Sequence, residues 1–319
     1  MKAGTTLLLC LLLSACGGGA GSAASGSQNN AGAVADNPAP AASVPASAPV
    51  TPPVAPPVAP PVVAVPGWTL VWSDEFDVDG LPDAAKWDYD TERNKVGWYN
   101  NEKQYYARAR AENAKVLGGK LIITARKETL NPVVFTDYGN QQYTSARLLT
   151  RGRPGASWTY GLIEVRAKLP CSLGTWPAIW TLGTGGVWPD DGEIDLMEQR
   201  GGSLADKAVV LGTVHTRAYN YYNGTLGVGQ GSSTVVTDAC SNFHTYQLTW
   251  SADKLQLGVD GNNYFEFLNP KDGNYTKWPF DRPQYLILNL AMGGDLGGAI
   301  PLNFVSDQME VDYVRVYQK

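Results

Sequence analysis

The sequence predicts an all-β fold, a sandwich or jelly roll, and three observations support this prediction. Apolar and polar residues alternate with a period of two, as where Ile163, Val165 and Ala167 are separated by Glu164 and Arg166, and this alternation is typical of a half-buried strand. No stretch longer than about two turns keeps the 3.6-residue period of a helix. The strand-like runs are short and are separated by turns rich in Gly, Asn and Pro, as in antiparallel β architectures.

In chain order, each predicted strand either repeats this alternation or is a short apolar run bounded by turn residues. These strands lie over residues 120–125, 145–149, 163–169, 208–215, 246–250, 255–259, 264–267, 285–290 and 309–317. Asp260 and Gly261 stand between two of the runs and predict a hairpin turn, because Asp-Gly is a preferred pair for a two-residue hairpin loop.

The composition favours one globular core and argues against several classes of function. The chain has 319 residues, of which 44% are hydrophobic and 17% charged, and its net charge of -5 argues against a nucleic-acid partner. The sequence contains no phosphate-loop or serine-elbow motif. Its two histidines, His215 and His244, lie too far along the chain from any cysteine or acid cluster to suggest a zinc site. The ten Trp and 16 Tyr residues suit the binding of an uncharged, ring-shaped ligand. We expect the protein to be a monomer.

The N-terminus is typical of an export signal. The apolar run Leu7–Leu13 is too short for a membrane span, which takes about 20 residues, so residues 1–15 are interpreted as a signal peptide. The following Leu13–Gly17 (LSACG) resembles a bacterial lipoprotein processing box. That resemblance implies cleavage before Cys16, lipidation of Cys16 and anchoring to a bacterial membrane, in the periplasm or at the cell surface. The alternative is cleavage near Ala15 and release of a soluble, secreted protein.

Residues 16–65 are interpreted as a disordered linker. They consist mainly of Gly, Ala, Ser and Asn, followed by repeated Pro-Pro pairs, and consecutive prolines favour extended polyproline II. We expect this segment to hold a domain at 66–319 away from the membrane; a ligand for a proline-binding domain is the alternative.

Cys171 and Cys240 are the cysteines that follow the signal region. In an exported protein an even pair predicts one disulfide, which would close a loop of about 70 residues and contribute roughly 3–4 kcal/mol. Two free buried thiols are the alternative.

Three carboxylates stand within the segment Gly192–Glu198. Glu193 and Asp195 share a face of a strand because side chains alternate. Glu198 would point to the opposite face unless a β-bulge near Leu196 and Met197 restores the parity. Proximity then raises one carboxyl pKa and leaves a proton donor beside an ionised partner. Two such carboxyl groups are the catalytic residues typical of glycoside hydrolases. A separation of about 5–5.5 Å gives retention of the anomeric configuration, and a larger separation gives inversion. A calcium-type acid cluster or a solvated strand face are the alternatives.

Tryptophans flank these acids. Trp98, Trp176 and Trp188 are predicted to offer indole faces to pyranose rings, each contributing roughly 2 kcal/mol before ordering costs. Trp180 suits the core and the groove about equally, whereas Trp72 and Trp250 are expected in the core.

The ordered set of motifs resembles glycoside hydrolase family 16, specifically the laminarinase-like bacterial β-glucanases, over about Trp68–Lys319. The motifs are WSDEF (72–76), NNEKQYY (100–106), YTSAR (143–147), WPAIW (176–180), GEIDLME (192–198), TVH (213–215), FHTY (243–246), LNLAMGG (288–294) and VDYVRVY (311–317).

The resemblance implies a β-jelly roll of two antiparallel sheets with a concave substrate groove and a retaining mechanism. It assigns Glu193 as nucleophile, Glu198 as acid/base and Asp195 as the residue that tunes them. Groove positions match Asn100, Arg147, Trp176, Trp180 and His215. The resemblance implies no cofactor for catalysis, but it does imply a structural calcium ion on the convex side, bound by the carbonyls of Glu75 and Gly119 and by Asp312.

The predicted function is endo-hydrolysis of β-1,3-glucan of the laminarin type, including mixed β-1,3/1,4-glucan. A glucan transglycosylase using the same site and a non-catalytic surface lectin are the alternatives. A sulfated galactan is disfavoured because a polyanion calls for convergent Arg and Lys, and the predicted groove segments contain few beyond Lys103 and Arg147.

Overall fold

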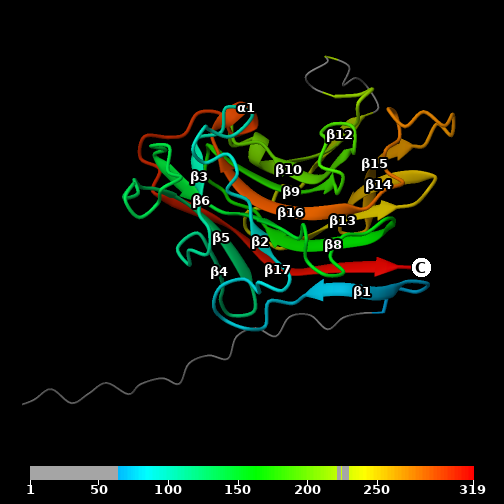
Figure 1. Ribbon diagram of the computed structural model, residues 1–319, viewed down its shortest axis with the longest axis horizontal. Helices are drawn as coiled ribbons and strands as arrows, with labels where there is room; N and C mark the ends of the chain where they lie inside the picture. The colour runs from blue at the N-terminus through cyan, green and yellow to red at the C-terminus, as the bar shows by residue number, and fades with distance from the viewer. Residues whose placement is uncertain (1–63, 221–223, 225–229) are drawn as a thin grey trace, which may run out of the picture. The chain divides into compact units, whose positions relative to one another are not determined.

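The computed structural model describes residues 64–220, 224 and 230–319, which are almost entirely β-structure (Figure 1). The predicted signal peptide, Cys16 and the linker up to residue 63 lie outside the described residues. Among the residues described, no helix is both long and apolar enough to span a membrane.

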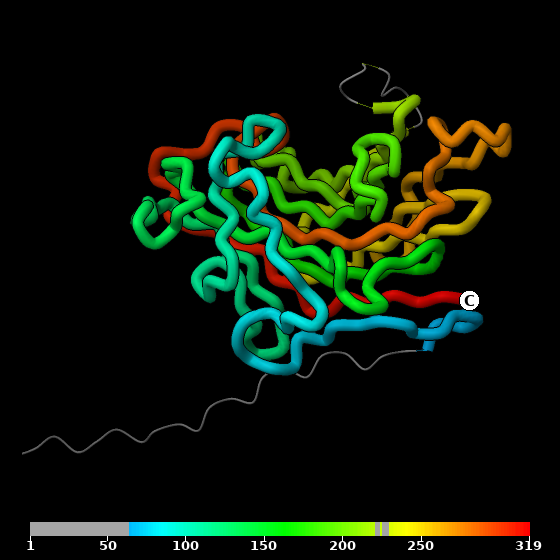
Figure 2. The backbone as a smooth tube through the Cα atoms, in the orientation of Figure 1, coloured from blue at the N-terminus to red at the C-terminus, as the bar shows by residue number. Residues whose placement is uncertain are grey.

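The larger of two sheets has ten strands, in the order β15-β14-β13-β8-β17-β5-β6-β3, with β1 paired to β17 and β4 paired to β5. Its pairings are antiparallel except that of β3 with β6. Figure 2 shows the last strand, in red, running beside the first, in blue. The strand bounds are β1 Thr69–Asp74, β3 Gln104–Tyr106, β4 Ala114–Val116, β5 Leu121–Lys127, β6 Tyr143–Ser145, β8 Gly161–Lys168, β13 His244–Trp250, β14 Lys254–Val259, β15 Asn262–Leu268 and β17 Ser306–Gln318.

The second sheet has seven antiparallel strands in the order β12-β11-β10-β9-β16-β7-β2. It lies above the first sheet in Figure 1. Its strands are β2 Asp88–Tyr89, β7 Arg147–Leu149, β9 Thr175–Gly183, β10 Glu193–Gln199, β11 Val209–His215, β12 Gly231–Val235 and β16 Gln284–Met292. A 3-10 turn, Asp206–Ala208, precedes β11, and a short helix α1, Gly294–Gly297, follows β16.

One hydrophobic core lies between the sheets, because each sheet contributes one face of its alternating side chains. Ile163 and Val165 of β8 belong to the same buried cluster as Leu286 and Leu288 of β16. Trp250 is also buried in it, and Trp72 packs against it, as predicted. The predicted all-β, two-sheet jelly-roll class is therefore confirmed.

Two local predictions are also confirmed. Asp260 and Gly261 have φ of 51° and 79°, and they join β14 to β15 where Val259 pairs with Asn262, as a two-residue hairpin requires. Cys171 and Cys240 form a disulfide, with their Cα atoms 5.2 Å apart.

Candidate active site

Strand β10 carries the three carboxylates, and a β-bulge sets their direction. On one side, Asp195 pairs with Trp180 and Glu198 with Ala178, so two residues of β10, Leu196 and Met197, lie opposite the single residue Ile179 of β9. The register against β11 shifts at the same place. The intervening Leu196 and Met197 are buried in the core. The bulge predicted from the spacing therefore exists and returns Glu198 to the face that carries Glu193, which we call the outer face of the seven-stranded sheet.

Glu193 is held by an indole. The Nε1–H of Trp188 donates a hydrogen bond to Glu193 Oε2. The Trp188 ring centroid also lies 6.3 Å from that of His215. Trp188 is 40% exposed, so its ring both orients the carboxylate and presents an apolar surface to solvent.

Glu198 is bound by a second indole. Trp176 Nε1–H donates to Glu198 Oε1 over 2.9 Å. Burial raises the pKa of Glu198 to about 7, and the charges of Glu193 and Glu102 act in the same direction, while His215 and the Trp176 bond oppose it. A carboxyl with this pKa is half protonated near neutrality, which suits a group that must both donate and accept a proton.

His215 lies directly opposite Glu193 in the pairing of β10 with β11. Its Nε2 is 3.2 Å from Asp195 Oδ2. Burial alone would lower the pKa of His215, but Asp195, Glu193 and Glu198 outweigh it and raise the pKa to about 9. The expectation that neither histidine lies near an acid cluster is therefore wrong, because strand pairing brings together residues about 20 positions apart in the sequence.

Asp195 completes the cluster and is 3% exposed. Burial raises its pKa well above the ordinary value, and Glu193 and Glu198 add to this effect, while His215 opposes it. Glu193, Asp195 and His215 each offer one possible ligand atom, and these three atoms lie within 4.8 Å of one another. Three such atoms at these distances could bind a metal ion. A protonated His215 is the cation that the described residues place there.

A cationic and aromatic layer lies farther along the same sheet, where β16 joins β7 to β9. The Arg147 guanidinium is 4.6 Å from the Trp180 ring centroid and 5.1 Å from that of Trp98. Arg147 Nε is also 3.0 Å from Asp90 Oδ2. Trp180 Nε1–H donates to Asn289 Oδ1 over 2.7 Å. The positive charge of Arg147 is therefore balanced by Asp90.

The exposed indole faces predicted from the sequence are found at Trp188, whereas Trp98 and Trp176 are each 7% exposed. The Trp98 ring packs against Tyr106 and lies beneath the Arg147 guanidinium, so it presents little of its face. Its Nε1–H donates to Asn94 Oδ1 over 3.0 Å. Asn100 adopts a positive φ of 55°, and its carbonyl accepts a hydrogen bond from Asp295 N.

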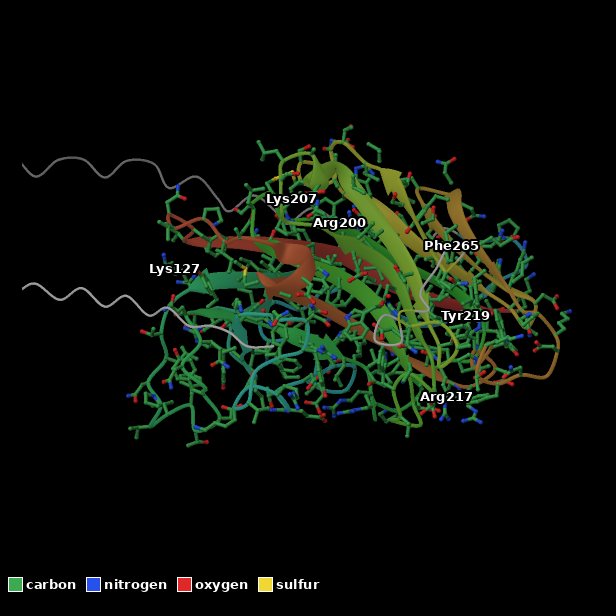
Figure 3. All side chains as sticks on the ribbon, turned by 90° about the horizontal axis from the view of Figure 1, so that it is seen from above. Lys127, Arg200, Lys207, Arg217, Tyr219 and Phe265 are labelled. Atoms are coloured by element: carbon green, nitrogen blue, oxygen red, sulfur yellow. A yellow bond between two sulfur atoms is a disulfide. The ribbon has the colours of Figure 1, made fainter. Side chains whose placement is uncertain are left out.

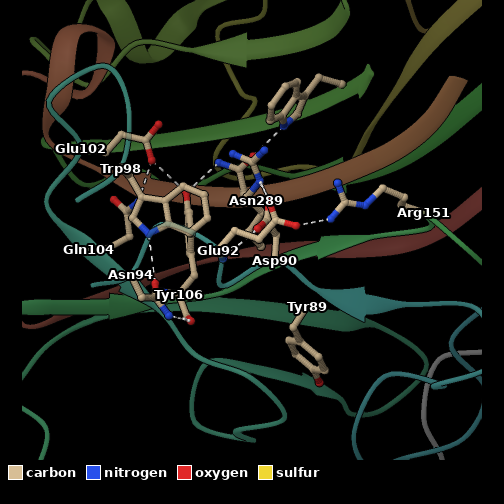
Figure 4. Close-up of polar contacts among 12 residues, drawn as sticks. Tyr89, Asp90, Glu92, Asn94, Trp98, Glu102, Gln104, Tyr106, Arg151 and Asn289 are labelled. Atoms are coloured by element: carbon tan, nitrogen blue, oxygen red, sulfur yellow. Dashed lines mark hydrogen bonds and ion pairs between the residues drawn. The ribbon is translucent and has the colours of Figure 1, made fainter. Parts of the chain in front are cut away.

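Sequence reasoning missed a polar chain that supports this layer (Figure 4). Glu102 Oε2 accepts hydrogen bonds from Gln104 Nε2 at 2.6 Å and from Tyr106 OH at 3.2 Å. Asn289 Nδ2 donates to Tyr106 OH at 3.1 Å, so the chain continues to Trp180. Burial raises the pKa of Glu102, against the effect of Arg147. Asn289, the single Asn in an otherwise apolar stretch of β16, could have indicated this chain, since buried polar side chains need hydrogen-bonding partners.

The three residues expected to bind calcium lie on the ten-stranded sheet. Asp312 stands in β17 between Val311, which pairs with Leu121, and Val314, which pairs with Asp74. Glu75 directly follows Asp74, and Gly119 lies two residues before Leu121, so the register brings all three residues close to one another. Asp312 Oδ2 is 2.5 Å from Arg166 Nη1, and the Glu75 carboxylate binds Arg315. This leaves backbone carbonyls and one Asp312 oxygen, the hard oxygen donors that calcium prefers.

Comparisons with known proteins agree with this architecture. A family model for glycosyl hydrolases family 16 matches residues 101–315. A β-glucanase from Rhodothermus marinus is 48% identical over 264 residues, covering 79% of this chain and 86% of that protein. The solved structure of a non-specific endo-β-1,3(4)-glucanase is similar with a TM-score of 0.75 and 51% identity, covering 81% of this chain and 94% of that one. A LamA variant from Zobellia galactanivorans, in complex with laminaritriose and laminaritetraose, has a TM-score of 0.67 and 40% identity, with 78% and 99% covered.

Proposed function

Because the chain belongs to glycosyl hydrolase family 16, we propose that it is an endo-acting, retaining hydrolase of β-1,3-glucan, including mixed β-1,3/1,4-glucan. The observation that carries this proposal is the pair Glu193 and Glu198. Both lie on the outer face, each bound by an indole N–H, and burial raises the pKa of Glu198 to about 7.

In the first step, the ionised Glu193 attacks the anomeric carbon, and Glu198 gives its proton to the leaving glycosidic oxygen. A covalent glycosyl-enzyme forms, and the glycosidic C–O bond breaks. In the second step, Glu198 takes a proton from water, and the resulting hydroxide displaces Glu193 from the anomeric carbon. The stereochemistry is inverted twice and so is retained.

The surroundings favour this division of roles. Glu193 accepts the Trp188 N–H and lies opposite His215 in the pairing of β10 with β11, so its carboxylate is oriented on the outer face. The Asp195 side chain is a hydrogen-bonding partner of His215 and raises the pKa of that imidazole. Burial of Glu198 and the nearby carboxylates of Glu193 and Glu102 favour the protonated form of Glu198.

A neutral substrate suits the site better than a sulfated one. The Asp90 carboxylate balances the charge of Arg147, which leaves that guanidinium to donate hydrogen bonds to sugar hydroxyls rather than to attract a polyanion. The Trp188 ring is exposed and can pack against the C–H face of a pyranose.

A substrate panel tests the proposed function. The full chain is incubated with laminarin, lichenan, curdlan, agarose and carrageenan, and reducing ends and viscosity are followed over time. We expect reducing ends from laminarin and lichenan, with an early fall in lichenan viscosity because cleavage is internal. Binding without new reducing ends would instead indicate a lectin, and products longer than the starting oligosaccharide would indicate a transglycosylase.

A structural calcium ion is part of the proposal. The carbonyls of Glu75 and Gly119 and the other oxygen of Asp312 would hold it, and it would join the end of β1 and the start of β5 to the middle of β17. We expect EGTA to lower the melting temperature of the wild type and added CaCl₂ to restore it, whereas Asp312→Asn should show neither response. An identical melting temperature with and without EGTA would contradict the site.

We further propose that Cys16 is lipidated and anchors the enzyme to the bacterial membrane. The support is the LSACG motif after a short apolar run. Labelled palmitate fed to expressing bacteria should be incorporated into the wild-type chain but not into Cys16→Ala. Equal labelling of both chains, or of neither, would count against the anchor.

A further inference from the structure

Lys207 is a buried lysine beside the end of β10, the strand that carries the three carboxylates (Figure 3). It lies in the 3-10 turn before β11 and is 5% exposed. Its Nζ donates to the Thr175 carbonyl at 3.0 Å, to Thr175 Oγ1 at 2.6 Å and to Gln199 Oε1 at 3.1 Å. The three N–H groups of the ammonium therefore meet three neutral oxygens, which fills its hydrogen-bonding capacity.

The two partners of Lys207 flank the candidate acid/base. Thr175 directly precedes Trp176, which donates its indole N–H to Glu198, and Gln199 directly follows Glu198. Thr175 and Gln199 are both fully buried, because alternate side chains of a strand point to opposite faces. Lys207 thus links β9 to β10 from the core side, behind the Trp176–Glu198 bond on the outer face.

The backbone pairing of β9 with β10 ends at this point. The last paired residues are Ala178 and Glu198, and Pro177, the next residue of β9, has no N–H to donate. Strand β9 continues to Thr175, where it remains paired with β16. Beyond the last pair, the bonds of Lys207 connect the two strands, and past both strand ends the Gly174 N–H donates to the Gly201 carbonyl at 3.0 Å.

A lysine is costly at this position. Burial lowers the pKa of Lys207 to about 7, while Asp307 and Asp206 act in the opposite direction, so keeping the ammonium there opposes folding. A methionine could fill a similar volume without this cost. The hydrogen bonds, rather than packing, therefore explain a lysine here.

We propose that Lys207 is a positioning residue for Glu198, an inference that rests on the proposed function. By tying Thr175 to Gln199, the amine holds Trp176 and Glu198 in register, so that the Glu198 carboxyl faces the leaving oxygen. Loss of the amine weakens proton donation but leaves the sugar contacts of Trp188 and Arg147 in place. It therefore lowers kcat and leaves KM for laminarin nearly unchanged.

The test compares Lys207→Met with Arg200→Met on two substrates. Arg200 is the exposed residue after Gln199, so its variant removes the same charge from the same region (Figure 3). Laminarin needs a proton on its leaving oxygen, whereas 2,4-dinitrophenyl β-laminaribioside releases a stable phenolate without one. We expect Lys207→Met to lower kcat/KM roughly 10- to 100-fold on laminarin and less than about threefold on the dinitrophenyl glycoside. Arg200→Met should match the wild type on both.

Equal losses of kcat/KM on the two substrates would overturn the inference, since a general structural defect affects both. So would an unchanged kcat/KM on laminarin. Thr175→Val is the second variant if Lys207→Met does not fold. It keeps the Thr175 carbonyl and removes the Oγ1 hydroxyl, which accepts from Lys207 and donates to the Ser172 carbonyl. Thr175→Val should also lose more kcat/KM on laminarin than on the dinitrophenyl glycoside, by a smaller factor. A folded Thr175→Val with equal kcat/KM losses on the two substrates would also overturn the inference. Wild-type hydrolysis of laminarin, measured in the same series, reports separately on the proposed function.

Discussion

Replacing Glu193 by Gln is expected to lower laminarin hydrolysis by at least roughly 10⁴-fold, because an amide cannot form the glycosyl ester. The fold should survive, since the side chain lies on the outer face and its two neighbours in the sequence, Gly192 and Ile194, are unchanged. Reducing-end release and circular dichroism measure the two effects. The matched control is Glu112→Gln, which removes an exposed carboxylate and should leave activity unchanged.

Rescue of a Glu193 variant by azide tests whether Glu193 is the nucleophile. In Glu193→Ala, azide can occupy the space of the missing carboxylate and attack a dinitrophenyl glycoside directly, which gives the α-glycosyl azide by a single inversion. Near-wild-type turnover by Glu193→Gln, or a β-glycosyl azide from Glu193→Ala, would contradict its assignment as nucleophile.

Replacing Glu198 by Ala is expected to lower kcat/KM on laminarin by roughly 10²- to 10⁴-fold, the range for loss of a general acid. The loss on 2,4-dinitrophenyl β-laminaribioside should be much smaller, because its leaving group departs unprotonated. Azide should speed breakdown of the glycosyl-enzyme and give the β-glycosyl azide. A comparable loss on both substrates would show that Glu198 does not act as the acid.

The pH profile of the wild type follows from the same residue. Glu198 must be protonated to act as the acid, and burial raises its pKa to about 7. The value of kcat/KM on laminarin should therefore fall as the pH rises through about 7, while the dinitrophenyl glycoside should show a weaker alkaline decline. If kcat/KM declined equally for both substrates at alkaline pH, the group that titrates would not be Glu198 acting as the acid.

Much of the fold could be predicted from the sequence because the evidence is local. The alternation over residues 163–169 predicts a strand, and the Asp260-Gly261 pair predicts a hairpin turn; both are present. The bulge in β10 was also predictable, because three carboxylates on one strand have to share a face in order to work together. Each inference depends on residues only a few positions apart.

Other parts of the site depend on contacts between residues far apart in the sequence. His215 faces Glu193 only because β10 pairs with β11, and no spacing along the chain indicates that pairing. Asn289 joins Trp180 to Tyr106 across strands. The burial of Trp98 depends on Tyr106 and Arg147, which pack against its ring and which composition cannot indicate. Lys207 resembles an ordinary surface lysine until β9 and β10 are placed beside it.

The central claim is that Glu193 forms a covalent bond to the sugar while Glu198 handles the proton. Trapping the intermediate tests it most directly. The wild-type enzyme is treated with 2,4-dinitrophenyl 2-deoxy-2-fluoro-β-laminaribioside, digested, and mapped by mass spectrometry. One fluorinated laminaribiosyl ester on Glu193, absent when excess laminarin competes, is the predicted result. A label on Glu198 or elsewhere in the chain, or a hydrolysed probe that yields the α-anomer with no ester formed, would contradict the mechanism.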